Sequence, residues 1–286
     1  MNQIDFLREQ IEKTGYPLEI EISSILDPKW EVINTESYFD VDEKKMRDID
    51  IRADKPIVQE LMPLLLDVKL IVECKRDRDF AWVFFTRPLI FDWLEDINGQ
   101  YLDELQVLTK SSETTQIKDI ILGKTPYHYR DMNKIAVCYE EFHLQGKKNS
   151  FAQKKKEIFE AQNQLKKYIS YTNEQEMKAQ YPDLYRLIMY FPCIVFDGQM
   201  FEAIVEGTKI RLKRANHILL TTQNRTSYSN WEQGFLIDVV QKTYFEKYQR
   251  KVNRDFLSLR KIVKKNKRKI EGEIERTLSL IKTKMV

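Results

Sequence analysis

The chain has 286 residues, of which 42% are apolar and 12% aromatic, enough to fill the core of one large domain or two small ones. Its net charge is only +3, so the overall charge does not identify a polyanionic partner. The 32% of charged residues, with 8 glycines and 8 prolines, favours a helix-rich soluble protein and excludes a low-complexity chain.

The cysteines and the N-terminus predict the cellular environment. Cys74, Cys138 and Cys193 are widely spaced and form no Cys-x-x-Cys pair, which argues against a disulfide framework, a zinc site and an iron–sulfur cluster. The first 13 residues carry charges where a signal peptide needs an apolar core. No run approaches the roughly 18 apolar residues of a membrane span. We therefore expect a reduced, cytoplasmic protein without membrane contact.

Two helices are expected before the first strand. Residues 2–14 have the apolar spacing of an amphipathic helix that Gly15 ends. Pro17 suits the first turn of a second helix, which Asp27-Pro28 ends. Glu19 lies in that first turn, where the helix dipole favours an acid, so a structural role and a role in a site remain alternatives.

The next segments predict an antiparallel hairpin followed by a third strand. Trp30–Asn34 and Tyr38–Glu43 have extended character, and a turn is expected at residues 42–45. Arg47–Ala53 alternates polar and apolar residues, as a half-buried strand does. Val68–Lys75 is a β-rich run that ends in Glu-Cys-Lys.

Acidic side chains and one lysine meet at the ends of these strands. Asp50 lies between two isoleucines, while Glu73 and Lys75 are two residues apart and share a strand face. Asp48 shares the face of Asp50 and is the alternative first acid. Carboxylates at this closeness repel unless a cation lies between them, and hard oxygen ligands suit Mg²⁺ or Mn²⁺. The lysine could orient or deprotonate a water, or stabilise charge on a phosphate.

The middle of the chain has the weakest pattern. A charged turn is expected at Arg76–Asp79 and a buried strand at Phe80–Phe85. Residues 88–148 have no clear periodicity. Their segment Pro126–Arg130 holds tyrosines and a histidine, for which packing is favoured over stacking on bases. The three histidines of the chain lack the spacing of metal ligands.

A helix is predicted over Ser150–Ser170. Gln164 and Tyr168 are four residues apart and therefore neighbours on one helix face. The glutamine amide could hydrogen-bond a phosphate or a catalytic water, with the tyrosine supporting it. Ordinary packing of Tyr168 and an exposed Gln164 form the alternative.

Strands are expected again after this helix. Leu187–Phe196 and Met200–Val205 are predicted to pair through a turn at Asp197-Gly198. A second turn at residues 206–208 leads to at least one more strand within Ile210–Leu220.

The last part of the chain is expected to be helical. A helix is predicted from about Trp231 to Phe256, and the stretch from Lys247 to Lys269 is strongly basic. A basic helix can follow the phosphates of a nucleic acid with salt-dependent affinity. A solvated face on a helix that docks or dimerises explains the same pattern, and the two remain alternatives.

Around the acidic residues the chain resembles the PD-(D/E)XK nuclease superfamily. Asp50 matches the first acid, Glu73 the second acid and Lys75 the lysine of the motif. The first acid follows Ile49 here, without the proline that gives the motif its name. Glu19 resembles the acid that some members carry on a preceding helix.

The resemblance extends to a later helix. Gln164 and Tyr168 look like the Gln-x-x-x-Tyr element of some branches. The likeness covers roughly residues 15–90 and 150–200, and the order of elements is helix, strand, hairpin, Glu-Cys-Lys strand and glutamine-bearing helix.

The resemblance implies an α/β fold of the restriction-endonuclease type, with a mixed central β-sheet flanked by helices. An added β-hairpin region and a C-terminal helical extension complete it. The expected domains are a nuclease domain, residues 1–220 with an insertion at about 88–148, and a basic extension, residues 221–286.

The implied activity is Mg²⁺- or Mn²⁺-dependent hydrolysis of a nucleic-acid phosphodiester, with DNA as the favoured substrate. Asp50 and Glu73 would hold the metal, with the Cys74 backbone carbonyl as a further ligand. Lys75 would assist the water or the transition state, and Glu19 would act through a second metal or a water. The alternative is a nucleic-acid-binding or structural protein of the same fold without catalysis. Self-association or a partner protein at the C-terminal helices also stays open.

Overall fold

The computed structural model describes residues 2–26, 28–55, 64–89, 101–103, 119–120, 128–144, 156–178, 185–222 and 235–284. The helices are α1 (Gln3–Lys13), α2 (Tyr16–Ile25), α5 (Glu157–Lys178), α6 (Phe245–Lys265) and α7 (Lys267–Lys284), with short 3-10 turns η3 (His128–Asp131) and η4 (Lys242–Tyr244). The strands are β1 (Glu31–Asp40), β2 (Lys45–Lys55), β3 (Leu64–Pro88), β4 (Tyr101–Asp103), β5 (Lys134–His143), β6 (Tyr185–Glu206), β7 (Lys209–Arg214), β8 (His217–Thr222) and β9 (Phe235–Gln241). Among these helices, none is long and apolar enough to span a bilayer.

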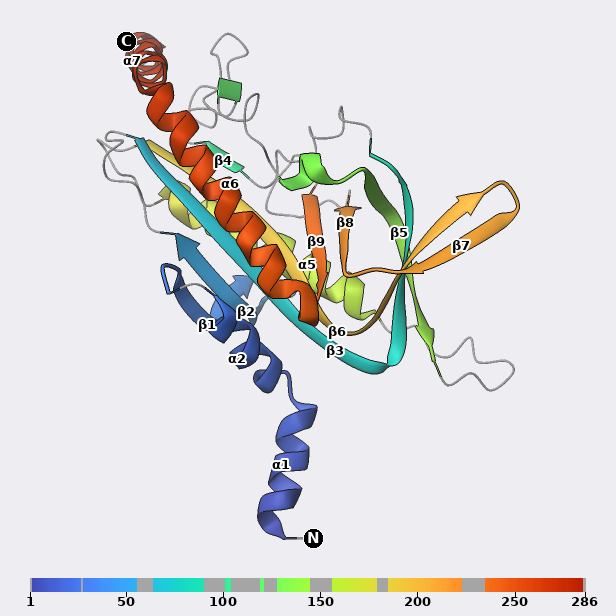
Figure 1. Cartoon of the computed structure of the whole chain (residues 1–286). Helices are drawn as coiled ribbons and strands as arrows, with labels where there is room; N and C mark the ends of the chain where they lie inside the picture. The colour runs from blue at the N-terminus through green and yellow to red at the C-terminus, as the bar shows by residue number, and fades with distance from the viewer. Residues whose placement is uncertain are drawn as a thin grey trace.

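One mixed β-sheet organises the described part of the chain (Figure 1). The strand order is β1-β2-β3-β5-β8-β9-β6-β4, and β7 pairs with β6. β1, β2 and β3 are antiparallel neighbours, whereas β3 and β6 run parallel along most of their length. Because β3 and β6 pair with each other, the strands β3, β5, β8, β9 and β6 form a closed circuit. The predicted mixed sheet is confirmed, and its restriction-endonuclease type stays a prediction.

Helices cover both faces of the sheet, as predicted. Leu70 and Val72 of β3 share one apolar cluster with side chains of α2, α6 and α7. Ile71, which points to the opposite face, belongs to a second cluster with the buried side of α5. The amphipathic spacing of the helices therefore serves two cores that lie on opposite sides of the same strands.

β3 and β6 are longer than the sequence predicts. The turns expected at Arg76–Asp79 and Asp197-Gly198 are wrong, because both strands continue through these positions and stay paired, with a register shift between Asp77 and Ala81. Figure 1 shows β3 curving sharply along its course. A Cβ on Gly198 would lie 2.3 Å from the Asp77 carbonyl oxygen and 2.3 Å from the Phe196 ring. The glycine is thus needed for close strand approach, not for a turn.

Replacing Gly198 by alanine is expected to lower the free energy of unfolding by about 2–3 kcal/mol, the usual cost of overpacking. Gly272→Ala is the matched control, because nothing lies within 4 Å of a Cβ at that position on α7. There we expect a gain of about 0.5–1 kcal/mol from helix propensity. Urea denaturation of the two variants checks the difference, and equal stabilities would contradict the close approach.

The C-terminal region differs from the predicted helix over Trp231–Phe256. Residues 235–241 form β9, which pairs with β6 and β8 inside the sheet, and α6 begins only at Phe245. Trp231 lies outside the described residues. The division at residue 220 stays a prediction, although β9 shows that the sheet itself continues beyond it.

The other predicted elements are largely confirmed. α1, α2 and the β1–β2 hairpin lie where expected, with β1 as a single strand. α5 extends to Lys178, beyond the expected end, and residues 150–155 are outside the described part. Within the expected insertion, β5 pairs with β3 and so belongs to the sheet. His128 and Tyr129 are fully buried, which confirms packing for these two residues.

A buried charged network joins α6 to the sheet. Asp238 of β9 lies 2.9 Å from Nε2 of His128, 2.6 Å from Nε2 of His217 and 2.9 Å from the Tyr248 hydroxyl, which donates to it. The other ring nitrogen of His128 lies 2.7 Å from Asp255 Oδ2. The network thus connects η3, β8, β9 and α6, so α6 is an integral part of the body described.

Candidate active site

The structure brings Glu19, Asp50, Glu73 and Lys75 together from three elements. In the β2–β3 ladder Ile51 pairs with Val72, and Asp50 and Glu73 are the next residues along their strands. The backbone N–H of Cys74 donates to Asp50 Oδ2 at 2.6 Å. Glu19 projects from the first turn of α2, and it is close enough for Asp50 and Lys75 to shift its pKa. The alternation read from the sequence therefore places these groups in one region.

We name Glu19, Asp50, Glu73 and Lys75 together the acidic site. Glu73 is its innermost group. Its side chain is fully buried, and its Oε2 accepts a hydrogen bond from Lys75 Nζ at 3.1 Å. The other oxygen, Oε1, is buried without a hydrogen-bond partner. Burying a carboxylate oxygen in this way is costly, so a group that satisfies Oε1 would relieve the cost.

The electrostatics of the acidic site favour protonated carboxyls in the protein alone. Burial and the nearby Asp50 charge raise the pKa of Glu73 to about 8. The same two causes raise the pKa of Glu19 to about 7, and burial raises the pKa of Asp50. Burial opposes the charged form of Lys75, but the Glu73 and Asp50 carboxylates outweigh it and raise its pKa. Three acids thus share one compensating cation.

These residues fit a hard divalent cation. The orphaned Glu73 oxygen, the neighbouring Asp50 carboxylate and their mutual repulsion are the features that a bound Mg²⁺ or Mn²⁺ would compensate. Mg²⁺ commonly needs only one or two carboxylates, because water and phosphate oxygens complete its shell. No set of three or more His, Cys, Asp or Glu residues is already arranged to hold a metal in the parts of the chain that the structure describes.

Asp48 is close enough for its charge to raise the pKa of Asp50, but its own carboxylate is held by the neighbouring strand. Its Oδ1 accepts a hydrogen bond from the Ser37 hydroxyl at 2.5 Å, on the exposed side of the hairpin. Asp50, by contrast, bonds the Cys74 backbone. The geometry therefore supports Asp50 over Asp48 as the first acid.

The acidic site opens to a cleft of about 1180 Å³ that Cys74 and Lys75 help to line. Its other charged lining residues are Glu9, Glu12, Asp77, Asp79, Glu157 and Glu160, with Arg76 and Arg78. Acids outnumber cations in this lining. A polyanion would consequently be repelled from the cleft unless cations accompany it.

Sequence reasoning missed Glu157 and Glu160, which lie in the first turn of α5. Both line the cleft beside Lys75, and the Glu157 carboxylate is among the charges that raise the pKa of Lys75. The local sequence does not mark them as site residues, because the helix dipole favours acids in the first turn of any helix.

Gln164 and Tyr168 contact the β1–β2 hairpin. Gln164 Nε2 donates to the Asp48 carbonyl oxygen at 3.4 Å, and the Tyr168 hydroxyl donates to the Glu36 carboxylate. The Tyr168 ring lies edge-on to Tyr38, with the centroids 5.6 Å apart. The buried Tyr168 agrees with the packing alternative, and a substrate-positioning role for Gln164 stays a prediction.

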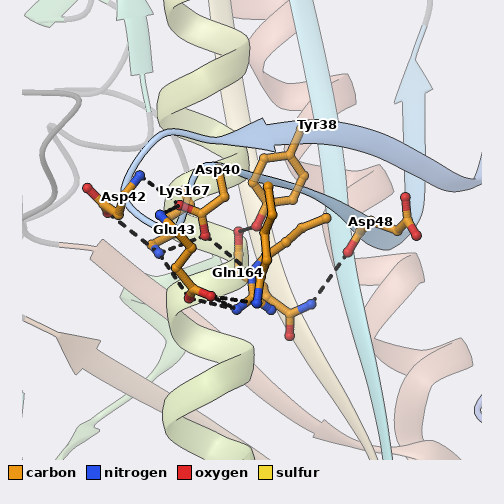
Figure 2. A network of polar contacts seen from close by, with 9 residues as sticks. Tyr38, Asp40, Asp42, Glu43, Asp48, Gln164 and Lys167 are labelled. Carbon is orange, nitrogen blue, oxygen red and sulfur yellow. Dashed lines mark hydrogen bonds and ion pairs between the residues drawn. The ribbon is translucent and has the colours of Figure 1, made fainter.

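An ion-pair network fastens the tip of this hairpin to α5 (Figure 2). Lys167 Nζ lies 2.8 Å from Asp40 Oδ2, and Arg47 lies 2.6 Å from Glu43. Asp40 also accepts from the backbone N–H groups of residues 42 and 43 and so stabilises the turn of the hairpin. The network therefore fixes β2, and with it Asp50, against the helix that carries Glu157.

Comparisons of this chain with protein-family models, with curated proteins and with solved structures yield no match.

Proposed function

We propose that the protein is a metal-dependent nuclease that hydrolyses phosphodiester bonds of nucleic acid, with DNA as the favoured substrate. The observation that carries the proposal is the fully buried Glu73, which has one oxygen on Lys75 and the other without a partner, beside Asp50. The order α2, β1, β2, β3 and α5 is also the order that the resemblance to PD-(D/E)XK nucleases predicts.

Each side chain has a role that follows from its position. A bound divalent cation would neutralise charge on the phosphate and acidify a water. Asp50 and Glu73 are the residues that would hold it. The Lys75 ammonium, with its raised pKa, stays charged at neutral pH and can donate to a phosphate oxygen as charge develops there. Glu19, with a pKa of about 7, is poised to take or return a proton near neutrality.

The acidic lining of the cleft makes the cation part of substrate binding as well. The phosphate backbone would enter a region where Glu157, Glu160 and the other acids of the cleft lining repel it. Divalent cations between these acids and the substrate would convert the repulsion into attraction. We therefore expect binding in the cleft and cleavage to need the same cation.

A cleavage assay tests the proposal directly. Plasmid, linear and single-stranded DNA are incubated with the protein and Mg²⁺ or Mn²⁺, and with EDTA instead of metal. We expect metal-dependent cutting that falls at least about 100-fold in Asp50→Ala and Lys75→Ala, the scale of losing an electrostatic contact to the transition state.

Asp48→Ala is the matched control, because Asp48 is the neighbouring acid on the same strand and its carboxylate is hydrogen-bonded to the Ser37 hydroxyl. It should retain cutting. Activity that survives in both Asp50→Ala and Lys75→Ala would contradict the site. Metal-dependent DNA binding without any cutting would favour a catalytically silent binding protein of this fold.

A further inference from the structure

The junction between α6 and α7 concentrates positive charge. Five of the six residues from Lys264 to Lys269 are lysine or arginine, and the sixth is Asn266, the C-cap of α6. We name this segment the polybasic turn. Its five charges exceed the net charge of +3 of the whole chain, so the remainder of the protein is net negative. The weakly basic composition thus hides a strong asymmetry.

The polybasic turn faces solvent because the opposite side of its helices is used in packing. Phe256, Leu259 and Val263 of α6 and Ile270 and Ile274 of α7 are buried in the core. An open hollow of about 450 Å³ is lined by Lys264, Lys265, Asn266, Lys267, Arg268 and Lys269. The lining contains no acid.

Helix electrostatics do not explain this arrangement. Lys264 and Lys265 lie in the last turn of α6, where the dipole favours cations. The three cations that follow lie at the start of α7, where the dipole disfavours them, and no acid occupies that first turn. One acid of α7, Glu271, lies one turn further along, 3.8 Å from Lys267. An external polyanion would relieve this local repulsion.

α6 connects the polybasic turn to the cleft of the acidic site. At its beginning, Lys242 of η4 lies 4.0 Å from Asp197, which also binds Arg76 of the cleft lining at 2.9 Å. Figure 1 shows α6 running from the side of α2 to the far end of the sheet, where α7 begins. The 21 residues of α6 span about 30 Å at 1.5 Å per residue. That length corresponds to about nine base pairs at about 3.4 Å each.

We propose that the polybasic turn binds the phosphate backbone of a nucleic-acid duplex whose other part lies in the cleft, about one α6 length away. The inference rests on the proposed function and adds where the substrate lies. A membrane surface is disfavoured, because an interfacial helix needs a free apolar face and the apolar residues of α6 and α7 named above are buried.

The test compares two variants that remove the same charge. The triple variant Lys265→Ala, Arg268→Ala, Lys269→Ala neutralises the polybasic turn. Lys209→Ala, Arg211→Ala, Lys213→Ala neutralises three exposed cations of β7. Binding of a labelled 30-base-pair duplex is measured by fluorescence anisotropy in EDTA over a range of salt. We expect the first variant to bind at least about tenfold more weakly at 0.1 M salt, with the slope of log K against log salt reduced by about 2.7. The β7 variant should stay within about twofold of the wild type.

A second readout uses cleavage with Mg²⁺. For the 30-base-pair duplex the polybasic-turn variant should show a raised KM and an unchanged kcat. For an 8-base-pair duplex, which is too short to reach both places, kcat/KM should match the wild type.

Each outcome decides the proposal. Equal losses in the two triple variants would mean that only net charge matters and would overturn it. So would turn-dependent binding to phosphatidylserine vesicles without duplex binding, which would indicate a membrane role. Turn-dependent duplex binding without any cleavage supports the polybasic turn while removing the nuclease proposal. Absence of duplex binding in EDTA removes the polybasic-turn proposal alone, and the cleavage assay with Mg²⁺ decides the nuclease proposal separately.

Discussion

Glu73→Gln is expected to abolish metal-dependent cleavage and at the same time to stabilise the metal-free protein. The buried carboxyl has a pKa of about 8, against its usual 4.5, because burial and Asp50 disfavour its charge. A carboxyl whose pKa is raised on folding holds its proton more tightly in the folded state. It therefore costs no stability below pH 4.5 and an increasing amount as the pH rises to about 8.

Glutamine cannot ionise and therefore removes this penalty. We expect the free energy of unfolding of the variant at pH 8 in EDTA to exceed that of wild type by about 2–4 kcal/mol. This figure takes about 1.4 kcal/mol for each pKa unit and subtracts the lost contact with Lys75. Cleavage should fall at least about 100-fold. Urea denaturation and the plasmid assay measure the two effects. Opposite signs for stability and activity are the signature of a functional site.

Added Mg²⁺ should reverse the order of stability. Wild type should gain about 2.7 kcal/mol at a metal concentration 100 times the dissociation constant, and Glu73→Gln should gain little. Asp67→Asn is the matched control, because Asp67 is also buried on β3 and is paired with Arg186 at 3.2 Å. Burial also raises the pKa of Asp67, but no metal is expected there, so any change in stability should be the same with and without metal. The metal site would be contradicted if Glu73→Gln were less stable than wild type at pH 8 and if Mg²⁺ changed the free energy of unfolding of neither protein.

Local alternation was enough to find the centre of the candidate site. Side chains of a strand alternate between faces, so the pattern around Asp50 and the pair Glu73 and Lys75 could be placed from the sequence. The same reasoning could not find Glu157, because only the packing of α5 on the sheet brings that acid to Lys75. The spacing of four residues correctly placed Gln164 and Tyr168 on one helix face. It could not show that this face contacts the β1–β2 hairpin.

Two larger errors of the sequence-based prediction, the turn at Gly198 and the helix over residues 235–241, have a common cause. Gly198 follows an aspartate and looks like a turn, yet it lies in β6 where a Cβ would come within 2.3 Å of the Asp77 carbonyl oxygen of β3. Phe235–Gln241 has no alternation, because β9 is buried on both faces in the middle of the sheet. Its one charged residue, Asp238, finds partners from far along the chain. Contacts of this kind leave no periodic trace in a sequence.

That buried network predicts a second pH dependence of stability. Burial opposes the charged ring of His128, but the charges and hydrogen bonds of Asp238 and Asp255 outweigh it and raise the pKa to about 9. The same pairing holds the pKa of Asp238 well below its usual value. A histidine whose pKa is raised on folding contributes its full stability below its unfolded value of 6.5 and loses it as the pH rises to about 9. The contribution is about 3 kcal/mol at about 1.4 kcal/mol per pKa unit.

Asp238→Asn is therefore expected to lower the free energy of unfolding by about 3–5 kcal/mol at pH 6.5, because it leaves the buried His128 charge with one carboxylate fewer. The loss should shrink toward pH 9, where wild type no longer has the ion pair. Urea denaturation from pH 6 to 9 measures the loss and its pH dependence. The substitution is made in the Glu73→Gln protein as well, which lacks the separate pH dependence of the Glu73 carboxyl. Asp131→Asn is the control, since its pair with Arg254 is exposed and should be worth at most about 1 kcal/mol. If Asp238→Asn and Asp131→Asn lost the same small amount at every pH, the network would not be what fastens α6 to the sheet.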